Sequence, residues 1–223
     1  MANFYQQTTN RDFAQILERK IIKHCAPTLC GIKPGCLFLI PFECLGAAAG
    51  QADSHGANLG LALQSCRKKL AAKGVRIVLL AKRSVGYVVY VYRPSQLRHS
   101  FLCPATAAFL AQEGYDYADV EACVSRLRRR MKQASVAEIC QRRCAFPHEI
   151  GIFLGYPLED VVGFIENQGE NYLFCGCWKV YSNERDARAC FCRYKECTRL
   201  LRRRFEEGED IERLTVGERD KAC

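Results

Sequence analysis

Several features that identify common protein classes are missing from this sequence. None of its apolar runs approaches the roughly 20 residues that a membrane-spanning helix needs. It contains no phosphate-binding loop, no dinucleotide glycine signature and no nucleophile elbow. The stretch from Met1 to Gln7 is polar and holds no apolar signal core, so we expect no export signal and a cytoplasmic location. These absences exclude common motif-bearing families without excluding enzymes in general.

The 223 residues also lack internal repeats and low-complexity linkers, which favours one domain over two. A chain of this length buries enough surface to form one core without disulfide bonds. We expect a single domain over residues 1–208. Mixed acidic and basic residues follow Gly208, so we expect a mobile tail over residues 209–223.

Fifteen cysteines are the most unusual part of the composition. In a secreted chain they would suggest a disulfide framework, but the number is odd and no export signal is found. Cys36 and Cys123 each replace an apolar residue within a hydrophobic pattern. Free cysteine behaves as a small, buried hydrophobe. We therefore expect most of these cysteines to be reduced core residues.

The formal net charge of +9 is concentrated in two helical stretches, 126–132 and 199–204. Such basic runs could bind nucleic acid, and binding of that kind would depend steeply on salt. Leucine or methionine interrupts both runs, which is typical of a solvated helix face whose arginine stems cover apolar surface. We favour the second interpretation, and we expect neither nucleic acid nor a membrane as a partner.

Hydrophobic periodicity predicts an α/β fold in a single domain. The predicted helices cover residues 12–24, 57–72, parts of 94–143, and a long C-terminal segment from Asn183; the predicted strands cover 36–42, 75–82, 87–92 and 172–181. The strand–helix–strand order over residues 36–82 predicts a parallel crossover, and the tight hairpin at 84–86 adds an antiparallel neighbour. The prediction is a mixed sheet of about four strands flanked by helices, with a helix-corner-helix unit and a long C-terminal helix.

The first motif block runs from His24 to Gly35 and brings an imidazole, a thiol and a lysine together. These groups could bind a metal, hold an anion, or form a nucleophile with its base. Neighbouring helical residues point about 100° apart, so His24 is poorly placed to deprotonate Cys25. The C-terminal end of a helix also raises a thiol pKa. The alternative interpretation is a helix stop whose turn is shaped by two prolines.

The second block, 146–164, reads as two short helices that meet at Gly155. Its spacing matches a helix-turn-helix unit, but the second helix, 158–166, is apolar and acidic and would repel phosphate. His148 and Glu149 resemble part of a zinc-peptidase helix, yet Ile152 stands where the second ligand is required. We expect the corner geometry without a DNA-binding function.

Two cysteine pairs offer further metal-binding hypotheses. Cys175 and Cys177 lie on one face of a predicted strand and could both reach a metal, although closed zinc sites use wider spacing. Cys190 and Cys192 lie nearly 200° apart on a helix, so they cannot chelate together. Cys175 and Cys177 are thus weak metal candidates.

Both blocks, together with Asn171-Tyr172 and the segment 178–181, resemble an uncharacterised family of small proteins from anaerobic bacteria, domain-of-unknown-function family 3793. The resemblance covers the chain from about Phe13 to Cys197. The family has no established activity, fold or ligand, so the resemblance implies no catalytic roles. It implies a link with iron or redox physiology, which no residue of this sequence shows by itself.

Our leading hypothesis is a cytosolic binding or accessory protein that holds a metal, an iron-related cofactor or a small anion between the two blocks. The candidate ligand-binding residues are His24, Cys25, Lys33, His148, Glu149 and Trp178. If the blocks serve one function, these residues should line a common pocket with walls from Phe146, Tyr156 and Trp178.

Two alternatives stay open at this point. One is a thiol-dependent enzyme in which Cys25 is the nucleophile and His148 its base. The other is nucleic-acid binding through the basic helices. The sequence leaves open whether the protein is an enzyme, and we expect a small ligand or a redox protein as its partner.

Overall fold

The computed structural model describes residues 10–45, 52–139 and 146–217. The helices are α1 (Asn10–Leu29), α2 (Ala52–Ala71), α3 (Pro94–Phe101), α4 (Pro104–Gln112), α5 (Val120–Ile139), α6 (Ile150–Phe153), α7 (Leu158–Glu166), α8 (Glu184–Glu206) and α9 (Ile211–Leu214), with a short 3-10 helix, η1 (Phe42–Leu45). The strands are β1 (Gly35–Pro41), β2 (Arg76–Arg83), β3 (Gly86–Tyr92), β4 (Phe174–Cys175) and β5 (Lys179–Val180). Within these ranges no helix is both long and apolar enough to cross a membrane.

The main sheet has three strands in the order β1-β3-β2, and both pairings are antiparallel. The predicted α/β fold with a long C-terminal helix is confirmed, whereas the predicted parallel pairing and the single mixed sheet of about four strands are wrong. The crossover through α2 does bring β2 back in the direction of β1, but β3 lies between them. All seven residues of β3 are buried, which explains why this strand takes the central position. The predicted strand 172–181 instead forms a separate hairpin of β4 and β5.

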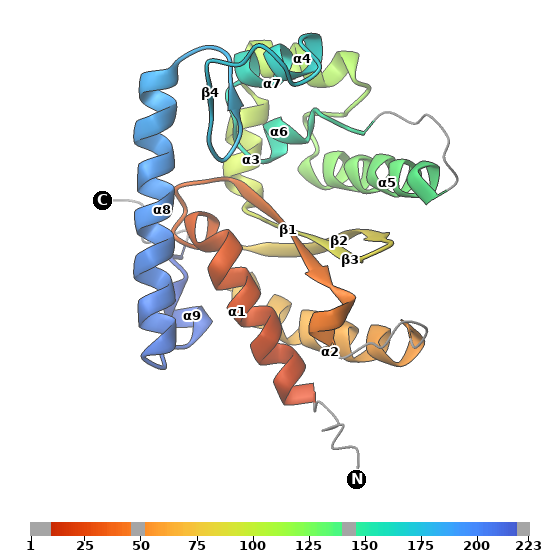
Figure 1. Ribbon diagram of the computed structural model, residues 1–223, viewed down its shortest axis with the longest axis vertical. Coiled ribbons are helices and arrows are strands. Elements are labelled where there is room, and N and C mark those ends of the chain that lie inside the picture. The colour runs from red at the N-terminus through yellow and green to blue at the C-terminus, as the bar shows by residue number, and fades with distance from the viewer. Residues whose placement is uncertain (1–9, 46–51, 140–145, 218–223) are drawn as a thin grey trace.

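Helices cover both faces of the main sheet, and the molecule has three layers (Figure 1). Successive residues of β3 alternate between two apolar clusters, as the pleat of a strand requires. Tyr87, Val89 and Val91 join α1, α2 and α9, whereas Val88, Tyr90 and Tyr92 join α3 to α7. Helix α8 runs along the side of both layers and contributes to both clusters.

The predicted helix-corner-helix unit is present as α6 and α7. Gly155 forms the corner with a φ of +76°, a left-handed conformation that favours glycine. A Cβ atom at this position would also lie 2.4 Å from the ring of Pro34. The corner, which belongs to the second motif block, thus lies directly against the turn that follows α1.

The C-terminal residues differ from the predicted tail. Residues 209–217 contain helix α9, whose Ile211 and Leu214 are buried in the same cluster as α1 and α2. The amide of Val216 donates a hydrogen bond to the carbonyl of Leu29 at 3.1 Å. The segment therefore completes the core, and within the predicted tail residues 218–223 lie outside the described chain.

Asp210 begins α9 by accepting a hydrogen bond from the Glu212 amide at 2.8 Å, and it pairs with Lys69 at 3.0 Å. The amide of Glu212 first, and then Lys69, lower the pKa of Asp210. We expect Asp210→Ala to lower the free energy of unfolding by about 1 kcal/mol at pH 7 in urea titrations. Because the folded pKa is depressed, this contribution is present above the unfolded value of about 3.9 and is lost as the pH falls through the folded value. Asp210→Asn keeps the cap and is the matched control; equal stability of wild type and Asp210→Ala would contradict the assignment.

Candidate functional site

A pocket of 410 Å³ lies where the C-terminal end of α1 meets the middle of α8 and the turn between β4 and β5. Gly31, with a φ of +68°, turns the chain back after α1 and brings Lys33 and β1 alongside the end of that helix. The pocket is lined by His24, Pro27, Lys33, Cys36, Cys177, Tyr194, Lys195, Thr198, Arg199 and Arg202. None of these residues is acidic, so the pocket is basic.

Lys33 is the most buried cation of this pocket, with 7% of its surface exposed. Its ammonium group donates a hydrogen bond to the Tyr156 hydroxyl at 3.0 Å and lies 4.5 Å from the centre of that ring. The Tyr194 ring lies 5.4 Å from the same nitrogen. Tyr156 in turn donates to the carbonyl of Cys177 at 3.0 Å. No carboxylate in the described part of the chain forms an ion pair with Lys33.

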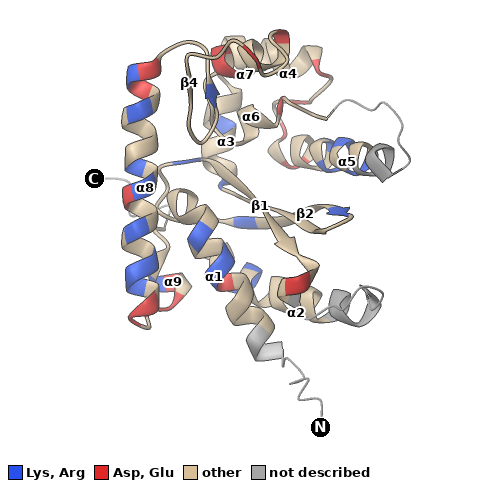
Figure 2. Ribbon diagram, viewed as in Figure 1, with Lys and Arg blue, Asp and Glu red and all other residues tan. Residues whose placement is uncertain are grey.

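The remaining cations of the pocket come from α8. On α8, Lys195, Arg199 and Arg202 follow one another at helical spacing, and Lys and Arg recur along α8 and α1 (Figure 2). Arg199 and Arg202 pair with the exposed Glu196 and Glu206 at 2.5 and 3.6 Å.

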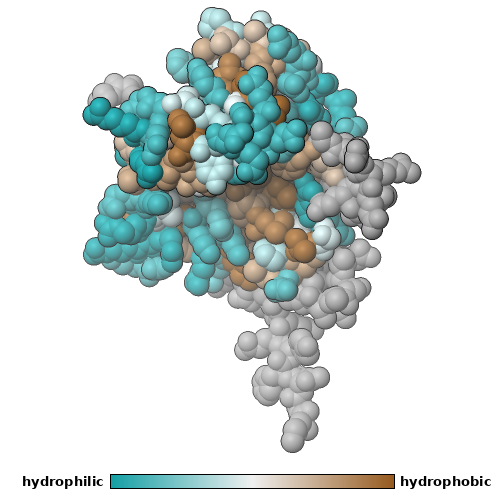
Figure 3. Space-filling view, turned by 45° about the horizontal axis from the view of Figure 1, so that its top comes forward, coloured by the Kyte–Doolittle hydropathy of each residue, from teal (hydrophilic) through white to brown (hydrophobic). Residues whose placement is uncertain are grey.

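His24 faces the pocket from α1 and stacks on Phe38 with ring centres 5.5 Å apart. Burial, then Lys23 and Lys20, lower the pKa of His24, so its imidazole is neutral at pH 7. Hydrophilic residues cover most of the face in Figure 3, and hydrophobic residues are visible at the recess between its upper and lower parts.

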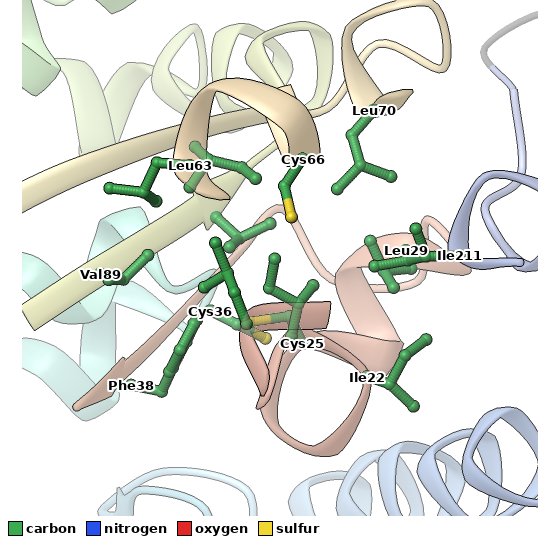
Figure 4. Close-up of a cluster of buried hydrophobic side chains, with 14 of the residues drawn as sticks. Ile22, Cys25, Leu29, Cys36, Phe38, Leu63, Cys66, Leu70, Val89 and Ile211 are labelled. Atoms are coloured by element: carbon green, nitrogen blue, oxygen red, sulfur yellow. The ribbon is translucent and has the colours of Figure 1, made fainter. Parts of the chain in front are cut away.

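Cys36 supplies a thiol at the floor of the pocket. Its sulfur accepts a hydrogen bond from the Thr28 hydroxyl at 3.1 Å and from the thiol of Cys25. The two sulfur atoms lie close together within the apolar cluster (Figure 4). The Cys25 thiol first, then Lys33 and Thr28, lower the pKa of Cys36 against the opposing effect of burial. Burial raises the pKa of Cys25, which has 0% of its surface exposed.

The two motif blocks do not share this pocket. His24 and Lys33 line it, but Cys25 lies behind its wall in the apolar core. His148 packs between the rings of Phe146 and Phe164, with ring centres 5.3 and 5.0 Å away, and burial lowers its pKa.

Glu149 points toward α5 instead. It accepts hydrogen bonds from Tyr115 at 2.6 Å and pairs with Arg130 at 2.8 Å. Cys25 is buried in the apolar core and His148 contacts aromatic rings, which argues against the alternative hypothesis of Cys25 as a nucleophile with His148 as its base.

The β4–β5 hairpin, which carries Cys175, Cys177 and Trp178, lies at the edge of the site. Trp178 stacks on Tyr156 with ring centres 4.8 Å apart, so it supports the tyrosine that holds Lys33. Cys177 lines the pocket, and burial raises its pKa; Cys175 is exposed and does not line the pocket. Among the described residues, no three His, Cys, Asp or Glu side chains are grouped to hold a metal ion. The predicted pair Cys175 and Cys177 thus lacks further ligands there.

Comparison with known families adds one finding. Residues 21–215 match the family described as "Protein of unknown function (DUF3793)". The chain belongs to the DUF3793 family. The match spans both motif blocks and all of the pocket residues. No curated protein and no solved structure gives a match.

The sequence prediction missed half of the pocket of this DUF3793 chain. The sequence assigns Arg199 and Arg202 to a solvated helix face and Cys36 to the core, and it makes no prediction for Lys195. One signal was available: these three cations recur at positions i, i+4 and i+7, which places them on one face of α8. Nothing in the local sequence indicates that this face lies against the end of α1.

The basic runs of this DUF3793 chain are extensively paired. In the first run, Arg126 donates to the Glu113 carbonyl and Arg130 pairs with Glu113 and Glu149. In the second, Arg203 and Arg204 pair with Glu207 and Glu209. Carboxylates interspersed in this way weaken attraction for a phosphate backbone, which supports the interpretation as solvated helix faces.

Proposed function

We propose that this protein binds a small anionic ligand in the pocket formed by the end of α1, the start of β1 and α8. The observation that carries the proposal is the burial of Lys33 beside other cations, without a carboxylate partner in the described chain. Burying an ammonium group is costly unless a negative charge or several hydrogen bonds compensate it. One tyrosine hydroxyl, two aromatic rings and the nearby Cys36 sulfur compensate only in part.

A bound anion would supply the missing compensation. Lys33 would contact it from the floor, and Lys195, Arg199 and Arg202 would contact it from α8. Thr198 lines the same wall, but its hydroxyl donates to the Tyr194 carbonyl at 2.8 Å, so the cations would orient the bound anion. The low dielectric of a half-enclosed site strengthens each of these charge interactions relative to water.

This proposal keeps the class of function expected from the sequence, a binding or accessory protein, and changes the location of the site. The first motif block contributes His24 and Lys33, but α8 takes the place of the second block. A role in the cytosol and a link with iron or redox physiology stay part of the proposal. The thiols of Cys36 and Cys177 at the pocket favour the redox link over metal storage.

We expect wild-type protein to bind inorganic pyrophosphate in titration calorimetry, with an affinity that falls as sodium chloride is added. Lys33→Met should weaken this binding about tenfold or more, because a charged hydrogen-bond donor is lost from the centre of the site. Lys68→Met is the matched control, since Lys68 is an exposed lysine on α2 outside the pocket. Equal affinities for wild type and the Lys33 variant would contradict the proposal, and so would a failure of wild type to bind.

A further inference from the structure

Two cysteines meet beneath the basic pocket and differ in their access to it. Cys36 comes from β1, has 4% of its surface exposed and lines the pocket. Cys25 comes from α1, is completely buried, and donates its thiol hydrogen to the Cys36 sulfur. Figure 4 shows the sulfur atoms of Cys25 and Cys36 next to each other, as their hydrogen bond requires. One thiol therefore faces the ligand space, and its neighbour lies directly behind it.

The surroundings of Cys36 differ from those of other buried cysteines in the chain. Burial raises the pKa of Cys66 and of Cys123 to about 12, as expected for thiols in an apolar core. Cys36 is buried as well, yet its pKa is lowered. The cause is a set of donors around its sulfur, namely the Cys25 thiol, the Thr28 hydroxyl and the Thr28 amide, together with the charge of Lys33. A thiolate is the nucleophilic form of cysteine.

We infer that Cys36 and Cys25 form a thiol–disulfide exchange site that reduces a small disulfide bearing carboxylate or other anionic groups. The preference for an anionic disulfide rests on the proposed function, because the cations of the pocket would attract it. The exchange itself rests on the contact between the two sulfur atoms and on the opening of Cys36 to the pocket.

The exchange has two balanced steps. The Cys36 thiolate attacks one sulfur of the disulfide RSSR, which forms a mixed disulfide with Cys36 and releases RS⁻. Cys25 then loses its proton to the released thiolate and attacks the Cys36 sulfur. This step forms the Cys25–Cys36 disulfide and releases the second RS⁻, which takes a proton from water. In total, one dithiol and RSSR give one protein disulfide and two RSH.

The site is tested on the whole, reduced protein under anaerobic conditions. We expect dithiodipropionate, which carries two carboxylates, to oxidise it at least about tenfold faster at low salt than the neutral bis(hydroxyethyl) disulfide. Cationic cystamine should be the slowest. Peptide mass spectrometry should find the Cys25–Cys36 disulfide in each product. Cys25→Ser should stop the reaction at a mixed disulfide on Cys36, and Cys30→Ser is the matched control because Cys30 does not line the pocket.

The experiments distinguish a failure of the exchange site from a failure of the anion site. Equal rates with all three disulfides while pyrophosphate still binds would overturn the anionic substrate alone, whereas equal rates together with no pyrophosphate binding would overturn the anion site as well. Absence of any Cys25–Cys36 linkage while pyrophosphate still binds would overturn the exchange site alone.

A measurement on the wild-type protein does not depend on the folding of any variant. Alkylation by iodoacetamide, followed residue by residue, should be half-maximal at Cys36 below the ordinary thiol pKa of about 8.5. A midpoint at or above that value would overturn the assignment of Cys36 as the attacking thiol.

Discussion

Replacing Arg93 with methionine is expected to lower the free energy of unfolding by about 3–5 kcal/mol, because several backbone carbonyls lose one shared, charged donor. Arg93 has 1% of its surface exposed. Its guanidinium group donates to the carbonyls of Thr28, Leu29, Lys73 and Val216 at 2.6 to 2.9 Å. These carbonyls lie at or just beyond the C-terminal ends of α1, α2 and α9, where helices leave acceptors unpaired and carry partial negative charge.

Urea unfolding followed by circular dichroism measures this effect. Arg98→Met is the matched control, because Arg98 is exposed on α3, and it should change stability by no more than about 0.5 kcal/mol. Arg93→Lys should fall between wild type and Arg93→Met, since lysine keeps the charge but has fewer donors and no planar fork. A stability loss below about 1 kcal/mol for Arg93→Met would mean that water replaces the guanidinium group at the helix ends.

Replacing Glu149 with alanine is expected to lower the free energy of unfolding by roughly 2–4 kcal/mol while leaving pyrophosphate affinity unchanged. Glu149 is 2% exposed and accepts from the Tyr115 hydroxyl, which is itself buried. It also pairs with Arg130, so its carboxylate ties α5 to the start of α6. Its loss leaves a buried hydroxyl without its acceptor and removes one of the carboxylates that Arg130 contacts.

Glu113→Ala is the matched control for Glu149. Glu113 pairs with the same arginine at 2.8 Å but is more exposed, so its loss should cost less than about 1 kcal/mol. Pyrophosphate titration on both variants separates a structural role from a ligand role. Reduced affinity in the folded Glu149→Ala protein would show that the second motif block contributes to the anion site.

The sequence predicts the elements of this fold well, but it predicts their pairing poorly. The hairpin between β2 and β3 and the apolar face of α8 follow from local patterns, and Phe191, Tyr194 and Leu201 on that face are buried. The parallel crossover was wrong because order along the chain does not specify which strand lies at the centre. A usable signal was present in β3, whose uncharged run Gly-Tyr-Val-Val-Tyr-Val-Tyr is typical of a strand covered on both faces. Strand β2 begins and ends with charged residues, which is typical of an edge strand.

The candidate site was predicted only where its residues are close in the chain. His24 and Lys33 stand on either side of one turn, so their proximity follows from the prolines and from Gly31. Cys36 was assigned to the core, and it is buried; the sequence does not show that Cys25 and Thr28 aim their hydrogen atoms at its sulfur. Contacts from α8 depend on packing between segments more than 150 residues apart, as with Lys33 and Tyr194. Such contacts leave no local pattern.

Helix α8 also determines whether the helices on the two faces of the main sheet can separate from it independently. It places Leu201 in one apolar cluster and Phe191 and Tyr194 in the other, on opposite faces of the sheet. Neither cluster can separate fully from the sheet while α8 keeps its position in the other, so the two layers form one cooperative unit. We expect the proposed anion, bound against Lys195 and Arg199, to slow amide hydrogen exchange on both faces of the sheet together, because it would bind only while α8 is in place.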